Sequence, residues 1–252
     1  MGDTLTLSEP STTLDISMYH RLLGLIQYLT ITCQDIFFVI NRPSQYMHGP
    51  SLAHWTTAKR NLHYLEGTLC HGTLFCSASS LQLTAFANAD WGGSFTDDRS
   101  SFGYVIYLGF DLISWKSTRQ KIVSHSSIGL EYHAVANATV EVLWVQHLLQ
   151  EIVAVLPRST SLFYNNRSAT YVCKILDFHS HMKHLSLDYF FVCDFVDAGS
   201  LIVQHIPSKA QIADKLTKPL GPNLFLHFRS KIEFSDGSSI LQGHIKDIDK
   251  MI

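Results

Sequence analysis

The first third of the chain places apolar residues at helical spacing. Apolar side chains recur every three or four positions in two stretches: Leu22, Leu25, Ile26 and Leu29 in the first, and Trp55, Ala58, Leu62 and Leu65 in the second. Ser51 and Gly67 are typical start and stop residues for the second helix. We therefore expect residues 18–76 to form a helical segment whose apolar stripes pack into a core. Residues 1–17 and 233–252 are interpreted as tails.

After residue 80 the pattern changes to the alternation of strands. A first strand is predicted at residues 81–87, where the odd-numbered residues share one side. Further strands are predicted at residues 101–108, 112–117, 161–164 and 201–206. Helices are predicted at 127–152, 168–176, 187–196, 212–216 and after Pro222. Three successive strands favour an antiparallel meander, and later strand–helix–strand units favour parallel additions. The order predicts an α/β domain over residues 81–232, with a five-stranded mixed sheet and flanking helices.

Composition narrows the function classes without choosing one. The 252 residues are 46% hydrophobic and 16% charged, which argues against a disordered chain. Lys and Arg total 19 against 21 Asp and Glu, so nucleic-acid binding would need a local basic surface. Five cysteines without C-x-x-C spacing argue against a zinc knuckle or a disulfide framework. With no signal-peptide pattern and no apolar run of ~20 residues, we expect an intracellular protein, cytoplasmic or nuclear, without a membrane partner.

Polar residues gather at the predicted strand ends and helix starts. Asn88 and Asp90 end the first strand, Glu131 opens the long helix, Asn165 ends the fourth strand, and Asp214 opens a late helix. Sheets of this class place their sites at such positions. Structural alternatives exist for the two Asn residues, which are common turn formers. They exist also for Glu131 and Asp214, because an acidic residue in a first helical turn interacts favourably with the helix dipole.

Taken together and in order, these stretches resemble a known family. Residues 86–91, 126–132, 163–169 and 211–220, with 113–115, are similar to motifs of the ribonuclease H domain in Pol polyproteins of copia-type LTR retrotransposons, plant copies in particular. Residues 19–32, 46–48 and 54–68 resemble the connection segment at the C-terminal end of the preceding reverse transcriptase. The resemblance covers residues 18–230 and implies a ribonuclease H-like sheet preceded by a small helical lobe.

The resemblance also implies a reaction and a metal site. The family cleaves the RNA strand of an RNA–DNA hybrid with two Mg²⁺ ions held by four carboxylates. Those positions fall on Asn88, Glu131, Asn165 and Asp214, so two of the four are amides here. An amide keeps the shape of the carboxylate and lacks its charge. Glu131 and Asp214 therefore remain as metal ligands, with Asp90 as a further candidate on the strand face of Asn88, and we expect Mg²⁺ binding and cleavage to be lost.

Three further expectations concern activity and partners. His205 falls near the point where related ribonucleases H carry a His that assists proton transfer or product release; the alternative is an edge-strand His without a role. A non-catalytic hybrid-binding module is the second functional hypothesis, in which Lys116, Arg119, Lys121 and Lys209 contact phosphates. The alternative for these four is solvated charge. A weakly active nuclease is the third hypothesis. No small-molecule cofactor is expected, and the oligomeric state stays open.

Overall fold

The computed structural model describes residues 15–73, 75, 81–91, 100–120, 127–166, 186–218, 221–231 and 234–236. The chain divides into two units, one formed by residues 1–74 with 221–252 and the other by residues 75–220. The second unit thus ends at Leu220, whereas the predicted domain extends to residue 232. The division follows from a two-stranded sheet in which β7 (Phe234–Asp236) pairs antiparallel with β1 (His71–Thr73).

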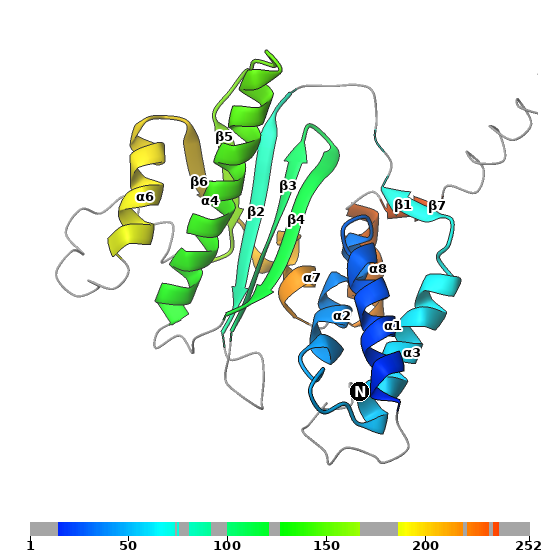
Figure 1. Cartoon of the computed structure of the whole chain (residues 1–252). Coiled ribbons are helices and arrows are strands. Elements are labelled where there is room, and N and C mark those ends of the chain that lie inside the picture. Colours follow the sequence, from blue (N-terminus) through cyan, green and yellow to red (C-terminus); the bar gives the residue numbers. More distant parts are fainter. Residues whose placement is uncertain are drawn as a thin grey trace, which may run out of the picture. The chain divides into compact units, whose positions relative to one another are not determined.

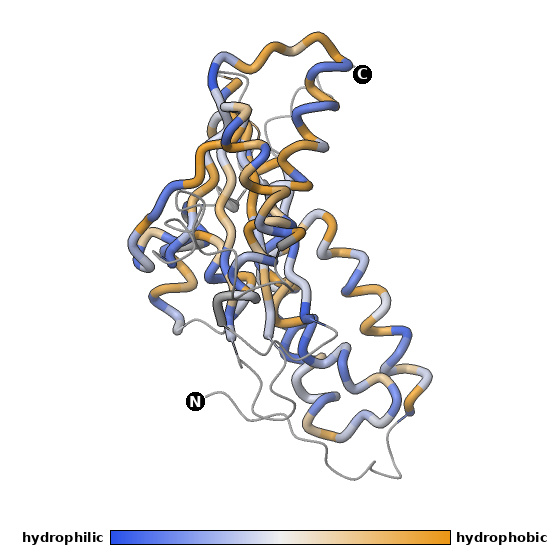
Figure 2. Tube along the Cα trace, turned by 90° about the vertical axis from the view of Figure 1, so that its left-hand side faces the viewer, coloured by the Kyte–Doolittle hydropathy of each residue, from blue (hydrophilic) through white to orange (hydrophobic). Residues whose placement is uncertain are grey.

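The first unit is mainly helical. Its helices are α1 (Ile16–Leu29), η1 (Gln34–Ile36), α2 (Phe37–Ser44), α3 (Leu52–Glu66) and α8 (Pro222–Lys231). Asp15 caps the start of α1 by accepting from the Met18 amide, and Ser51 with His54 forms a capping box at α3. Apolar and polar residues alternate along the helices in Figure 2, as expected for helices with one buried face.

The predicted core stripes of these helices are partly wrong. Tyr19, Leu23 and Ile26 are the buried residues of α1, whereas Leu25 is 62% exposed. In α3 the buried face carries His54, Ala58 and Asn61. Apolar spacing alone does not locate the buried face, because some polar residues are buried where they find hydrogen-bond partners. His54 is one of them, since its ring accepts from the Ser51 amide.

The second unit holds the predicted mixed sheet (Figure 1). Its strand order is β4-β3-β2-β5-β6, with antiparallel pairs from β4 to β2 and parallel pairs from β2 to β6. The strands are β2 (Leu83–Asp90), β3 (Ser101–Leu108), β4 (Asp111–Arg119), β5 (Thr160–Tyr164) and β6 (Leu201–His205). The first strand lies later than predicted, because residues 88–90 pair with residues 101–103 of β3. This strand order with its helices is the ribonuclease H-like arrangement expected from the sequence.

Helices complete the second unit. The long helix α4 (Ser127–Glu151) packs on the sheet through its predicted apolar stripe, which is buried in one cluster with α6 (Ser186–Asp197). The predicted helix at 168–176 lies outside the described residues. Short helices η4 (Ser208–Ala210) and α7 (Asp214–Thr217) follow β6. Within the described parts of the chain, no helix has the length and apolar character needed to cross a membrane.

A glycine in β3 lets α7 approach the sheet closely. Gly103 pairs with Asn88 of β2, and a Cβ atom built on Gly103 would lie 2.8 Å from Leu216 Cβ and 3.0 Å from the Lys116 carbonyl oxygen. Neither neighbour is the free end of a flexible side chain. The absence of a Cβ at residue 103 therefore lets α7 approach β3, the strand that pairs with β2 at Asn88.

We expect Gly103→Ala to destabilise the second unit by about 1–3 kcal/mol, because the added methyl group forces α7 or β4 to move. Thermal unfolding of the full chain measures this effect. Gly24→Ala is the matched control, since a Cβ at residue 24 meets nothing within 4 Å and alanine favours the helix. Equal loss of stability in both variants would contradict the role assigned to Gly103.

Candidate functional site

The candidate residues lie at one edge of the sheet. Parallel pairing places Ala87, Tyr164 and His205 side by side, at the carboxyl ends of β2, β5 and β6. Asn88 and Asn165 are the next residues in their chains. Asn88 is 3% exposed and Asn165 is half-buried. Because neighbouring strands lie about 5 Å apart, the two amide positions follow adjacent strands at the same edge of the sheet.

The structure joins Asn88 to Asp214 by a direct hydrogen bond. The Asn88 side-chain amide donates to Asp214 Oδ1 at 2.8 Å and to Thr217 Oγ1 at 2.7 Å. The Thr217 hydroxyl in turn donates to the Asp214 carbonyl oxygen at 3.3 Å. All three residues are buried. The amide therefore supplies a donor at the place where a carboxylate would face a second carboxylate.

The other oxygen of Asp214 is held by a lysine. Lys218 Nζ lies 2.7 Å from Asp214 Oδ2. Burial raises the pKa of Asp214, and the Lys218 ammonium partly offsets that rise. Burial also raises the pKa of Asp90, which the nearby Asp214 charge raises further and the Lys218 charge lowers. Asp90, Asp214 and Lys218 thus interact electrostatically, and the Lys218 ammonium lowers the pKa of both carboxyl groups.

Gln211 fixes α7 to the sheet beside this network. Its side chain is fully buried, donates to the Ala87 carbonyl at 2.8 Å and accepts from the Ala213 amide at 3.1 Å. On the other side of α7, the Ser117 hydroxyl donates to the Leu216 carbonyl. These bonds tie the four-residue helix α7 and the residues just before it to β2 and β4. The sequence pattern pointed to the motif at 211–220 and missed the roles of Gln211 and Thr217, which only their contacts with β2 reveal. It also missed Lys218, although its pairing with Asp214 has the local i,i+4 spacing of a helical ion pair.

Glu131 has a different partner from the expected one. It accepts a hydrogen bond from the Asn166 side chain. Burial raises the pKa of Glu131, and this hydrogen bond partly offsets the rise. The negative charge of Glu131 also contributes to the raised pKa of Tyr164. Among the described residues, Asn165 forms no side-chain hydrogen bond with Asn88, Glu131 or Asp214. Asn166 follows Asn165 in the chain, and the doubled Asn was the one sequence signal that pointed to it.

As arranged, these side chains do not suit a pair of divalent cations. Mg²⁺ binds oxygen lone pairs, whereas both Asp214 oxygens face N–H donors, one from Asn88 and one from Lys218. The described residues contain no group of three or more His, Cys, Asp or Glu side chains that could hold a metal ion. The contacts of Asp214 are therefore those of a hydrogen-bonded network that includes its ion pair with Lys218.

The remaining candidates are distributed around the sheet. His205 is the last residue of the edge strand β6 and is half-buried. Lys116 is exposed on β4, the opposite edge strand, where Arg119 is half-buried. Lys209 is exposed on η4. Lys121 lies outside the described residues. The three described basic residues therefore lie on elements near α7, since α7 contacts β4 and follows η4 by a few residues.

Comparisons with known proteins give a clear set of relatives. No family model matches the chain. The chain is 42% identical, over 90% of its length, to the retrovirus-related Pol polyprotein from transposon RE2 of Arabidopsis thaliana. It is 30% identical, over 82% of its length, to the corresponding polyprotein from transposon TNT 1-94 of Nicotiana tabacum. In each case the chain spans 16% of the relative.

Solved structures are more distant. The crystal structure of LC11-RNase H1 in complex with an RNA/DNA hybrid shares 15% identity with this chain at a TM-score of 0.40, covering 54% of this chain and 94% of the other. The assignment of the fold therefore rests on the strand order and on the relatives in sequence.

Proposed function

Since the chain belongs to the retrovirus-related Pol polyproteins of copia-type plant transposons, we propose that its ribonuclease H-like unit no longer cleaves RNA–DNA hybrids. The family activity needs two Mg²⁺ ions on four carboxylates. Two of those positions are Asn88 and Asn165, and the other two are Glu131 and Asp214. On this proposal the first unit corresponds to the connection segment at the end of the reverse transcriptase.

One observation carries the proposal: both oxygens of Asp214 accept from N–H donors, Asn88 and Lys218. A metal ion at this position would have to displace the lysine and turn the amide. A labelled RNA–DNA hybrid incubated with the full chain and Mg²⁺ or Mn²⁺ tests the proposal. We expect the hybrid to remain intact, and metal-dependent release of RNA fragments would overturn it.

Hybrid binding without cleavage is the second candidate function. It is favoured by the exposure of Lys116 and Lys209, which are available to phosphate oxygens. Phosphate contacts make affinity fall with rising salt, by a slope of about 0.9 per contact on a logarithmic scale for B-form DNA. A steep salt dependence would support this function. If no affinity is measurable, the lysines are solvated charges.

We also propose that His205 assists the reaction only in a chain whose carboxylates have been restored. Its position at the carboxyl end of β6, level with Tyr164, is compatible with such a role. The test adds His205→Ala to a variant that carries both Asn88→Asp and Asn165→Asp. We expect a rate about 10²-fold lower, within the usual range for a proton-transfer group. Equal rates with and without the imidazole would leave His205 as an edge-strand residue without a role.

A further inference from the structure

The face of the sheet that carries Asn88 is not the face that α4 covers. Side chains alternate along a strand, and in β2 the residues buried against α4 are Leu83, Ala85 and Ala87. Thr84, Phe86 and Asn88 therefore belong to the opposite face. In β5 the same alternation buries Leu162 and Tyr164 and places Ser161 and Phe163 on that opposite face.

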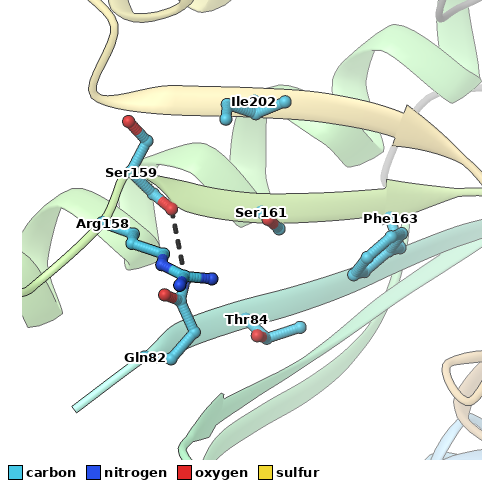
Figure 3. A pocket seen from close by; sticks show the side chains of 7 residues that line it. All are labelled: Gln82, Thr84, Arg158, Ser159, Ser161, Phe163 and Ile202. Atoms are coloured by element: carbon cyan, nitrogen blue, oxygen red, sulfur yellow. Dashed lines mark hydrogen bonds between the residues drawn. The ribbon is translucent and has the colours of Figure 1, made fainter. Parts of the chain in front are cut away.

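A depression lies on this second face, at the amino-terminal ends of the parallel strands. Its volume is about 520 Å³, within the usual range for ligand sites. It is lined by Gln82, Thr84, Arg158, Ser159, Ser161, Phe163 and Ile202. Figure 3 shows four of these side chains on the neighbouring strands β2, β5 and β6: Thr84, Ser161, Phe163 and Ile202. It is distinct from the network around Asp214.

The polar lining favours an anionic ligand. Arg158 is exposed and is the one charged residue of the lining, which contains no carboxylate. The Gln82 side chain donates at 3.2 Å to the carbonyl oxygens of Leu83 and Ser159, so its own oxygen is an acceptor beside the depression. Hydroxyl groups of Thr84 and Ser161 add neutral donors and acceptors. A guanidinium with neutral polar neighbours is suited to a phosphate group.

The apolar lining favours a flat ring. Phe163 stacks on Phe86 of the neighbouring strand, with ring centroids 5.2 Å apart and planes at 26°. Tyr107 meets Phe86 edge-on at 6.0 Å and holds that pair in place. Ile202, which pairs with Ser161, is 43% exposed on the neighbouring strand β6. Aromatic rings on adjacent strands of a sheet are the arrangement on which unpaired nucleotide bases stack.

We propose that this depression binds one nucleotide of a single-stranded nucleic acid, with its phosphate on Arg158 and its base against Phe163. A single strand fits better than a duplex, because only an unpaired base exposes a face for stacking. The charge of Arg158 also disfavours a basic or purely apolar peptide. The site does not depend on hybrid cleavage. It would give the unit a contact with nucleic acid at Thr84, which precedes Asn88 by four residues in β2 and lies about 13 Å from it along the strand.

Fluorescence anisotropy of a short labelled oligouridylate with the full chain tests the proposal. We expect Arg158→Gln to weaken binding and to reduce the logarithmic salt slope by about 0.7, the value for one phosphate of a single strand. Phe163→Leu keeps apolar volume and removes the ring, and we expect about 5- to 150-fold weaker binding. Arg21→Gln removes the same charge from an exposed position on α1 and should leave affinity unchanged.

The outcomes separate this proposal from the one on hybrid cleavage. Absence of oligouridylate binding, or equal affinity of the Arg158 and Phe163 variants with the unmodified chain, would overturn it. Inorganic phosphate that competes as well as uridine monophosphate would also overturn it, because the base would then make no contact. Arg158 is exposed, so its variant should fold normally, and thermal unfolding checks the Phe163 variant. Cleavage of a blunt-ended hybrid tests the other proposal and has no bearing on this one.

Discussion

The chain with Asn88→Asp and Asn165→Asp together is expected to cleave the RNA strand of an RNA–DNA hybrid in the presence of Mg²⁺. Each change adds one negative charge and a hard oxygen ligand beside Glu131 and Asp214. The new carboxylate at residue 88 would also remove the amide donor that now occupies Asp214 Oδ1. Cleavage of an end-labelled hybrid, followed on a gel with and without EDTA, measures the gain.

Either single change should restore much less activity, because ligands of one metal pair act as a unit and their effects are not additive. Asn223→Asp, on an exposed position of α8, adds the same charge away from the site and serves as the control. A double variant that is folded, binds Mg²⁺ and remains inactive would contradict the claim that the two amides account for the loss. Full activity in one single variant would contradict the claim of a coupled metal pair.

Asn88→Asp alone is expected to destabilise the metal-free chain by about 2–3 kcal/mol. The change replaces an N–H donor at 2.8 Å from Asp214 Oδ1 with an oxygen that repels it, and it leaves a buried acceptor without its partner. Lys218 can balance only one of the two charges. Denaturant unfolding of the metal-free chain measures the loss. Asn165→Asp should cost less, since Asn165 makes no such bond among the described residues.

The destabilisation should depend on pH. Two buried carboxylates that face each other raise the folded-state pKa of one of them, in addition to the rise that burial already imposes on Asp214. A raised pKa means that the folded state binds more protons than the unfolded state between the two pKa values. Stability then falls as pH rises through that window. The Asn88→Asp variant should therefore approach the unmodified chain in acid, and a pH-independent difference would contradict this explanation.

Local patterns predicted the second unit well. The strand at 101–108 and the helix that begins at Ser127 match their predicted bounds closely, because alternation and helical spacing there coincide with burial in one core. The buried faces of the helices in the first unit were predicted less accurately. Leu25 and Leu62 follow the apolar spacing and are exposed, while the buried positions include His54 and Asn61. The spacing of apolar residues contains no information on which polar side chains are buried with hydrogen-bond partners.

The candidate site shows the same limit. Motif order located Asn88, Glu131 and Asp214, and the strand order explains why the first and last of these meet. Their long-range partners were not predicted: Asn166 donates to Glu131, and Asn88 donates to Thr217. Such choices depend on a side chain's reach across the sheet, at separations of up to 129 residues for Asn88 and Thr217. No local pattern contains that information.

An Asn88–Asp214 hydrogen bond and the Lys218 ion pair stand where the family has metal ligands, so metal binding is the property to measure. Calorimetric titration of the full, unmodified chain with Mn²⁺, alongside the double carboxylate variant, makes the comparison. We expect no saturable binding to the unmodified chain at millimolar Mn²⁺ and clear binding to the double variant. Saturable binding of two ions by the unmodified chain would contradict this expectation.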